Sequence, residues 1–354
     1  MELNHYTYDI LTQPDALRKA IAGFDPSLFK PLVNAIASQK IDRIILTGMG
    51  ASYYAAYPAS LILARSRLPV IWMDASELIH YGRPLLSERA LLWIVSQSGR
   101  SAEALSLLDW AREYPPAALL AVSNDPQSPL AQAASLVLWL NAEPEKTVST
   151  RTYLNTLALG QLAALRLVGA DLGPHLDDLH ATAAAMQIYL ESWQAHLERI
   201  ASLVGKPERL VLLGRGASLT SSYCGALVIE EAAKFPAMAF QAAEFRHGPL
   251  EMARPDLDIL IFAGPPETRA LNLRLFDDLR RCDAHPLWID PLDGKTPASP
   301  EIPSVARLPM PEGRGVGLPI AEILPIQLLS LHLGRISGIE PGKFLHIGKV
   351  TTQE

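Results

Sequence analysis

The chain has 354 residues, of which 49% are apolar and 19% charged, with a formal net charge of -6 at pH 7. This composition favours about two globular domains, and the acidic charge argues against a nucleic-acid or anionic-membrane surface. The start of the chain lacks a signal-peptide pattern, no segment approaches roughly 18 uninterrupted apolar residues, and Cys224 and Cys282 are too few for a disulfide framework. We therefore expect a cytoplasmic protein with no membrane and no nucleic-acid partner.

The first half of the chain alternates short apolar runs with stretches of helical spacing. The segment "IDRIILTG" at 41–48, for example, is rich in Ile and Leu and predicts a buried strand that ends at glycine. The predicted helices cover 13–21, 26–38, 53–66 and 101–114, and the other predicted strands cover 69–76, 90–99, 117–125 and 136–142. Short apolar strands separated by helices indicate a parallel sheet with helices on both faces.

A second series of the same kind follows a long helical stretch from about Leu154 to Val204 that is interrupted at 169–174. Its predicted strands cover 209–216, 257–266 and 285–291, and its predicted helices cover 224–234 and 269–282. Each series contains an apolar strand followed by Gly-x-Gly-Ala-Ser, as "GMGAS" and "GRGAS". The sequence therefore predicts two copies of one small doubly wound α/β unit.

Ligands in such sheets bind at the carboxyl ends of the strands, where glycine admits a ligand and helix N-termini point their N–H groups at an anion. A dinucleotide fingerprint would need a third glycine where Tyr53 and Leu219 stand, and no Walker loop is present. The sequence thus argues against a nucleotide, and we expect no cofactor.

Hydroxyl groups gather at the same predicted edge. The segment "SQSGRS" places Ser96, Ser98 and Ser101 between a strand and a helix, as in sites that hold a phosphate monoester. Ser52 and three hydroxyls of "TVSTRT", those of Thr147, Ser149 and Thr150, could converge on the same anion. Serines also cap helices whatever the function. A single serine favours that structural role, whereas the whole cluster favours binding.

Six stretches, in chain order, resemble the motifs of a known family: "GMGASYY", "VSQSGRSAEAL", "AEPEKTVSTRTYLNTL", "LLGRGAS", "GALVIEEAAK" and "EFRHGPLEM". They are similar to the sugar isomerase (SIS) domain pair found in glucosamine-6-phosphate synthase, and "YTYDILTQPDALRKAI" resembles its lead-in helix. The resemblance implies an α/β fold of two flavodoxin-like SIS domains, a sugar 6-phosphate ligand and a homodimer with a shared active site. The domains implied are lead-in helices and a first SIS domain at 1–170, a connecting helix at 171–204, a second SIS domain at 205–340 and an active-site tail at 341–354.

The resemblance also implies which residues bind the phosphosugar. The implied phosphate ligands are Ser52, Ser96, Gln97, Ser98 and Ser101, the backbone near the sugar is that of Gly50 and Ala51, and the sugar is lined by Thr147 and Val148.

Three further residues match catalytic positions of the family. Glu231 takes the place of the glutamate that moves a proton between carbons 1 and 2, although a helical Glu near Lys234 is by itself typical of a solvated ion pair. His247 matches the histidine, delivered from the neighbouring subunit, that opens the sugar ring. Lys349 matches the lysine that forms a Schiff base with the ketose carbonyl. No second histidine completes a metal site near His247, and we expect no metal.

The chain also departs from the synthase. Cys224 and Val228 stand where the synthase has a charged pair, and Arg100 replaces an acid beside the expected phosphate site. The chain begins at the lead-in helix without a glutaminase domain, so we expect no synthesis from glutamine. Our leading hypothesis is a deaminase that converts an amino-sugar 6-phosphate to ammonia and a ketose 6-phosphate. A fructosamine-6-phosphate deglycase and a non-catalytic sugar-phosphate sensor remain open.

Overall fold

The computed structural model describes residues 3–291, 302–303 and 306–353, and its contacts divide the chain into two compact units. The N-terminal sheet unit comprises Asp15–Glu145, Ser149–Asp177 and Leu345–Glu354, and the C-terminal sheet unit comprises Met1–Pro14, Lys146–Val148 and Asp178–Phe344. The last ten residues therefore group with the first sheet, and the first fourteen group with the second.

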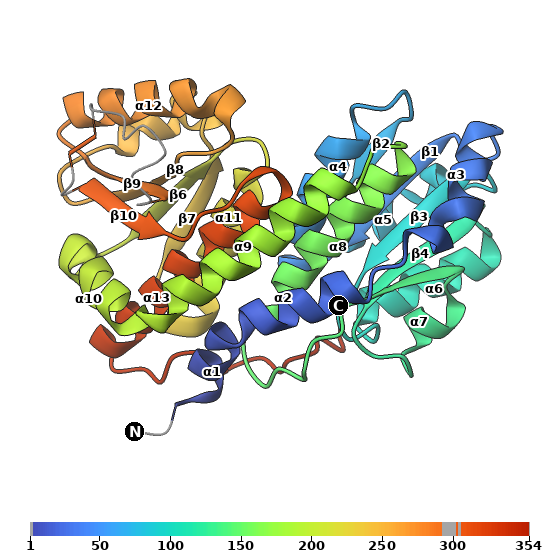
Figure 1. The fold of residues 1–354 in the computed structure, drawn as a ribbon, viewed down its shortest axis with the longest axis horizontal. Helices are drawn as coiled ribbons and strands as arrows, with labels where there is room; N and C mark the ends of the chain where they lie inside the picture. The colour runs from blue at the N-terminus through green and yellow to red at the C-terminus, as the bar shows by residue number, and fades with distance from the viewer. Residues whose placement is uncertain (1–2, 292–301, 304–305, 354) are drawn as a thin grey trace. The chain divides into compact units, whose positions relative to one another are not determined.

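The N-terminal sheet unit is built on five parallel strands in the order β2-β1-β3-β4-β5. Figure 1 labels the first four of these strands. The strands are β1 (Arg43–Gly48), β2 (Val70–Trp72), β3 (Ala90–Val95), β4 (Ala118–Ser123) and β5 (Leu136–Trp139). The helices that lie wholly in this unit are α3 (Lys30–Ala37), α4 (Gly50–Leu63), α5 (Ala75–Tyr81), α6 (Ala102–Glu113), α7 (Pro129–Ala133) and α8 (Arg151–Leu167). Helix α2 (Gln13–Ala22) belongs to it from Asp15 onward, and helix α9 (Gly173–Glu191) belongs to it as far as Asp177.

Alternate residues of these strands enter two separate apolar cores. Ile44 and Leu46 of β1 pack in the core shared with α4 and α8, whereas Ile45 packs in the core shared with α5, α6 and α7. Helices therefore cover both faces of the sheet, which explains why its strands are apolar at nearly every position.

The C-terminal sheet unit repeats this architecture. Its five parallel strands follow the order β7-β6-β8-β9-β10, which is the same order in terms of chain position. The strands are β6 (Leu210–Gly214), β7 (Ala237–Gln241), β8 (Asp258–Phe262), β9 (His285–Pro291) and β10 (Arg307–Met310). The helices are α1 (His5–Leu11), α10 (Trp193–Val204), α11 (Ser218–Ala233), α12 (Pro266–Arg281) and α13 (Leu318–Ile336). The predicted α/β fold with two flavodoxin-like sheets is confirmed.

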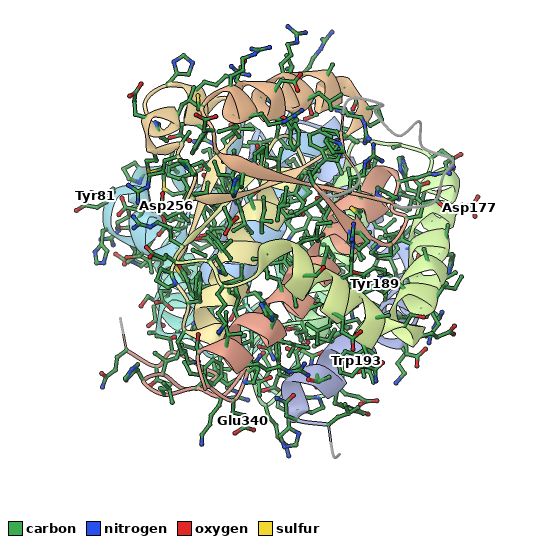
Figure 2. All side chains as sticks on the ribbon, turned by 90° about the vertical axis from the view of Figure 1, so that its left-hand side faces the viewer. Tyr81, Asp177, Tyr189, Trp193, Asp256 and Glu340 are labelled. Carbon is green, nitrogen blue, oxygen red and sulfur yellow. The ribbon has the colours of Figure 1, made fainter. Side chains whose placement is uncertain are left out.

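Helix α13 is the central buried helix of the C-terminal sheet unit and packs along α11. Among the described residues, the segment Gly315–Ile336 has the length and hydropathy of a membrane-spanning helix, but 89% of its most apolar window is buried within the structure. A helix that is apolar on all sides is expected in the core of a large domain. Tyr189, labelled in Figure 2, also lies in this unit and donates its hydroxyl to the carbonyl of Pro309, 3.0 Å away.

Some boundaries differ from the predictions. The predicted strand at 69–76 ends at Trp72, because Asp74 accepts a hydrogen bond from the N–H of Glu77 and caps α5. The predicted strand at 90–99 ends at Val95, where the serine-rich turn begins. The structure also contains α5, α7, β7, β10 and α13, which the apolar patterns of the sequence do not predict.

Candidate functional site

The loops after β1 and β3 lie at the carboxyl edge of the first sheet, as the sequence predicts. Gly50 begins α4 with φ of +52°, and Gly99 has φ of +59° in the turn after β3. A side chain at Gly99 would be strained and would also clash, since its Cβ would lie 2.3 Å from the hydroxyl oxygen of Ser128. Glycine therefore shapes both turns.

The three serines of the second turn each accept a local backbone hydrogen bond. Ser96 accepts from the N–H of Gly99 at 3.2 Å, Ser98 from that of Arg100 at 3.2 Å, and Ser101 caps α6. Within residues 3–291, 302–303 and 306–353, none of these hydroxyls donates its own proton to a protein acceptor. Helix capping and anion binding are therefore compatible here, because a hydroxyl can accept and donate at once.

A small pocket brings together residues that are far apart in the sequence. It is lined by Ala51, Ser52, Gln97, Ser149, Thr152, Tyr153 and Thr156. Thr152 and Thr156 are one turn apart on α8 and so share a face of that helix. We call this the serine-threonine pocket. Three of the nine residues expected to bind substrate, namely Ala51, Ser52 and Gln97, line it.

Lys349 of the C-terminal tail lies beside this pocket. Its ammonium group is 3.2 Å from the carboxylate of Glu145 and donates a hydrogen bond to the hydroxyl of Ser149 at 3.2 Å. The tail is also fixed by the N–H of Ala102, at the start of α6, which donates to the carbonyl of Thr351 at 3.2 Å. Lys349 thus contacts a pocket-lining residue directly.

The side chain of Glu145, which pairs with Lys349, is fully buried. Its carboxylate accepts hydrogen bonds from the N–H and hydroxyl groups of both Thr150 and Thr152, at 2.6–3.1 Å. Burial alone would raise the pKa of Glu145, but the charge of Lys349 and these hydrogen bonds outweigh it and lower the pKa below its usual value. Glu145 is therefore a carboxylate at neutral pH and anchors the Lys349 ammonium.

The remaining residues expected in the phosphate and sugar site lie outside the pocket lining. Ser96, Ser98 and Ser101 belong to the adjoining turn, and Gly50 starts α4. Thr147 and Val148 group with the C-terminal sheet unit, and Val148 is buried.

Arg100, expected to add positive charge beside the phosphate, is paired instead. Its guanidinium contacts the carboxylate of Asp125 at 3.0 Å and donates to the carbonyl of Gln127 at 2.8 Å. Asp125 offsets the charge of Arg100, so Arg100 does not add a full positive charge beside the turn that contains Ser96 and Ser98.

Glu231 and His247 belong to the C-terminal sheet unit. Glu231 lies half-buried in the last turn of α11, where its negative charge adds to the effect of burial in raising the pKa of the Tyr6 hydroxyl. His247 is exposed and follows the short helix η3 (Glu244–Arg246), with its N–H donating to the carbonyl of Glu244 at 2.8 Å. Across the described residues, no group of three His, Cys, Asp or Glu side chains is arranged to hold a metal.

Sequence reasoning missed Glu145, Thr152, Tyr153 and Thr156. Glu145 and Thr152 stand inside the quoted motif "AEPEKTVSTRT", so the motif marked the region without identifying its buried acid. An acidic residue between an apolar strand and a threonine-rich helix start is the signal that could have found Glu145.

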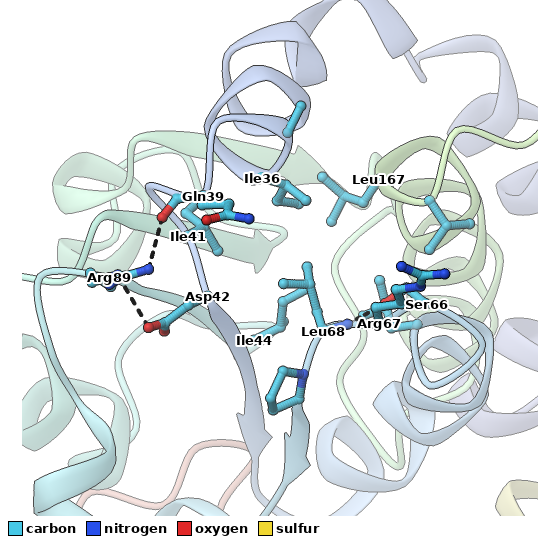
Figure 3. A pocket seen from close by; sticks show the side chains of 14 residues that line it. Ile36, Gln39, Ile41, Asp42, Ile44, Ser66, Arg67, Leu68, Arg89 and Leu167 are labelled. Carbon is cyan, nitrogen blue, oxygen red and sulfur yellow. Dashed lines mark hydrogen bonds and ion pairs between the residues drawn. The ribbon is translucent and has the colours of Figure 1, made fainter.

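A larger pocket of about 530 Å³ lies elsewhere in the N-terminal sheet unit, where β1 and β2 begin (Figure 3). Its walls include Ile36, Ile44 and Leu167, and on its rim Arg89 pairs with Asp42 at 3.2 Å. It contains none of the expected site residues, and it lies at the amino ends of the strands rather than the carboxyl ends, where ligands bind in such sheets. We assign it no role in the chemistry.

Comparison with known proteins places these features in a family. The chain is 27% identical over 350 residues to the isomerizing glutamine–fructose-6-phosphate aminotransferase of Pyrobaculum aerophilum. This similarity covers 98% of this chain and 57% of that relative. The chain thus spans little more than half the length of that enzyme.

Two solved structures share the fold. The C-terminal domain of glucosamine-fructose-6-phosphate aminotransferase from Francisella tularensis matches with a TM-score of 0.86 and 21% identity, over 97% of this chain and 98% of that one. Glucosamine-6-phosphate deaminase from Thermotoga maritima matches with a TM-score of 0.73 and 20% identity, over 98% and 100%.

The family model of the SIS domain matches twice, at residues 36–166 and 203–333. Each match covers the strands of one sheet up to β5 or β10, and together they cover well over half of the chain. The chain belongs to the SIS domain family, with two copies of the domain.

Proposed function

We propose that this protein converts an amino-sugar 6-phosphate of the glucosamine-6-phosphate type, with water, to a ketose 6-phosphate and ammonia. The observation that carries the proposal is the placement of Lys349, whose ammonium contacts Ser149 at the edge of the serine-threonine pocket and is held by buried Glu145. An amine beside hydroxyl-rich loops suits a substrate that has both a carbonyl carbon and a phosphate. The names of the similar proteins, an aminotransferase and a deaminase of hexose 6-phosphates, agree with this substrate class.

Phosphate binding is proposed for the two loops at the carboxyl edge of the first sheet. Ser52 and Gln97 line the pocket, and the hydroxyls of Ser96, Ser98 and Ser101 retain protons that a phosphate oxygen can accept. The backbone of Gly50 and Ala51 opens α4, whose N-terminal N–H groups favour an anion. Thr147 and Val148 precede Ser149 and are proposed to approach the sugar.

The proton transfers are assigned to the C-terminal sheet unit. His247 would pass the proton that the ring oxygen gains as the sugar opens, because an exposed imidazole has one nitrogen that can donate a proton and one that can accept it. Glu231 would take the proton from carbon 2 and return it to carbon 1, which turns the amino aldehyde into a ketose imine. The nitrogen of that imine then leaves as ammonia, and the oxygen of a water molecule takes its place in the ketose.

Lys349 is assigned to the carbonyl end of the reaction. Its amine, in the deprotonated form, would add to carbon 2 of the ketose imine and displace ammonia, which leaves an imine between Lys349 and carbon 2. Water would then hydrolyse that imine to the ketose and the free lysine. Glu145 positions this amine and does not itself touch the sugar in the proposal. We further propose that the protein is a homodimer in which His247 of one subunit completes the active site of the other.

One observation supports a second candidate, a sensor that binds the phosphosugar without turning it over. Cys224 and Val228, which replace the charged pair of the synthase, are both buried against the core of the C-terminal sheet unit. Val228 has no ionisable group, so these two positions no longer hold the charged pair that the synthase has there. A sensor would keep the serine-threonine pocket and lose the chemistry.

The experiment that tests these alternatives follows the release of ammonia and of free amino acid from a panel of hexosamine 6-phosphates and fructosamine 6-phosphates. Glu231→Gln is the inactivating variant, and Glu230→Gln is its matched control, because Glu230 is the exposed neighbour on the same helix. Ammonia release that is lost only in Glu231→Gln supports the deaminase. Amino-acid release would establish a deglycase instead, and binding without turnover of any compound would establish a sensor.

A further inference from the structure

The C-terminal sheet unit contains a cationic cleft in a protein whose net charge is negative. The cleft measures about 400 Å³, and its walls are formed by Arg215, Arg246, Leu271, Arg274, Asp277, Asp278 and Arg281. Four arginines against two aspartates leave a positive excess at this place. We call it the arginine cleft, and it shares no residue with the serine-threonine pocket.

Arg215 is held in a fixed orientation at this cleft. It follows Gly214, the last residue of β6, and its Nε donates to the side-chain oxygen of Asn272 at 3.2 Å. Asn272 is fully buried, and its amide nitrogen donates to the carbonyls of Phe262 and Ala263 at 3.1 and 3.2 Å. The buried amide thus fixes one edge of the guanidinium, and its two terminal nitrogens make no hydrogen bond within the described part of the chain.

The charges of the other arginines are only partly compensated. Asp278 alone pairs with two of them, Arg246 at 2.5 Å and Arg281 at 2.7 Å. Arg274 has no hydrogen bond or ion pair to any residue that the structure describes. Burial first, and then repulsion from Arg246, lower the pKa of Arg215.

We infer that the arginine cleft binds a phosphorylated small molecule, with Arg215, Arg246 and Arg274 as its phosphate ligands. The cleft adjoins the carboxyl end of β6, the edge at which ligands bind in parallel sheets. Guanidinium groups match phosphate oxygens through paired N–H bonds, and a cleft of this size accommodates a molecule as large as a sugar phosphate. Because Arg246 directly precedes His247, an occupant also fixes the segment that carries the proposed ring-opening residue.

The test measures how many phosphate ions bind per chain, by equilibrium dialysis with radiolabelled inorganic phosphate at constant ionic strength. Arg274→Ala removes a cleft arginine that is exposed, and Arg280→Ala removes an exposed arginine of the same helix that does not line the cleft. We expect Arg274→Ala to weaken one binding event about tenfold or more, as for the loss of a charged hydrogen bond, and Arg280→Ala to leave it unchanged. Arg215→Lys, which keeps the charge but loses the planar fork, should weaken the same event.

The same measurement distinguishes phosphate bound at the serine-threonine pocket from phosphate bound at the arginine cleft. Ser98→Ala changes the loop proposed for substrate phosphate and should leave the Arg274-dependent event intact, so failure of the proposed function and failure of this inference give different results. Equal weakening by Arg274→Ala and Arg280→Ala would overturn the inference, because the effect would then be one of general charge. A single phosphate per chain, lost in Ser98→Ala, would overturn it also, as would displacement of phosphate from the cleft by an equal concentration of a dicarboxylate.

Discussion

The ammonium of Lys349 lies 3.2 Å from the carboxylate of Glu145, and this ion pair joins the C-terminal tail to the segment that leads into α8. The two residues are 204 positions apart in the chain. The carboxylate is fully buried and the lysine side chain is 20% exposed, so the pair is shielded from water on the carboxylate side. The ion pair gives Lys349 an anchoring role beside the nucleophilic role that we propose for it, and substitutions can separate the two.

Lys349→Met and Lys349→Arg should differ in stability but agree in activity. Lys349→Met leaves a buried carboxylate without its cation and should lower the free energy of unfolding by about 3 kcal/mol. Lys349→Arg keeps the charge but cannot form an imine, so stability should change by less than about 1 kcal/mol while turnover is lost. Denaturant unfolding and the ammonia-release assay check the two expectations, with Lys343→Met, an exposed lysine of the same segment, as the control. Activity retained in Lys349→Arg would exclude the imine.

Glu322 should make stability fall as pH rises towards neutrality. It is buried on α13, where the hydroxyls of Ser218 and Ser221 donate to it at 2.7 and 2.6 Å, and burial raises its pKa from the usual 4.5 to about 7. Between these values the folded protein binds a proton that the unfolded chain has released, so the free energy of unfolding decreases across this window. The full effect is about 3 kcal/mol, at roughly 1.4 kcal/mol per pKa unit.

Glu322→Gln should therefore flatten the pH dependence of unfolding between about pH 4.5 and 7. Urea unfolding at a series of pH values measures this, and Glu340→Gln is the exposed control, labelled in Figure 2. An unchanged slope in Glu322→Gln would mean that Glu322 is not the group that titrates.

Gly99→Ala should destabilise the protein more than a comparable glycine substitution elsewhere, because Gly99 lies in the turn that contains Ser96 and Ser98. Its φ is +59° and its Cβ would clash with the hydroxyl of Ser128, whereas Gly169, with φ of +78°, has open space around it. Both variants carry backbone strain of about 1 kcal/mol, and Gly99→Ala adds the steric term. We expect Gly99→Ala to raise KM for the sugar phosphate as well as to destabilise, and Gly169→Ala only to destabilise slightly. Equal KM values in Gly99→Ala and Gly169→Ala would show that the turn at Gly99 does not bind the phosphate.

A shared active site predicts complementation between two inactive variants. Glu231→Gln and His247→Ala, unfolded together and refolded as a mixture, should regain up to about a quarter of the original activity, because half of the dimers are mixed and each has one intact site. Either variant refolded alone is the control. Absence of recovery, with mixed dimers verified by mass spectrometry, would show that each subunit works with its own histidine.

The sequence predicted the architecture well where the pattern is local. Apolar strands ending at glycine, such as 41–48, identified the sheets, and the repeated Gly-x-Gly-Ala-Ser loops identified the duplication. Helix α13 was missed because it is apolar on all sides and so has no helical period. Strands β7 and β10 were missed because their sequences, "AMAFQ" and "RLPM", contain few of the Ile, Leu and Val residues that mark the other strands.

The site was less accessible to sequence reasoning because its contacts are not local. The residues around the turns, such as Ser52 and Gln97, follow from strand ends and motifs. The burial of Glu145, its pairing with Lys349 and the pocket-facing threonines of α8 depend on how distant segments meet, which no periodicity encodes. The pairing of Arg100 with Asp125 was hidden for the same reason.

The most direct test of the central proposal is reductive trapping of the protein with fructose 6-phosphate and borohydride, followed by peptide mass spectrometry. Borohydride reduces an imine to a stable amine and so fixes the sugar on the lysine that formed it. The proposal predicts a hexitol phosphate adduct on Lys349, lost in Lys349→Arg and reduced when Ser52 or Gln97 is replaced. Full turnover without an adduct on Lys349, or an adduct spread evenly over exposed lysines, would contradict it.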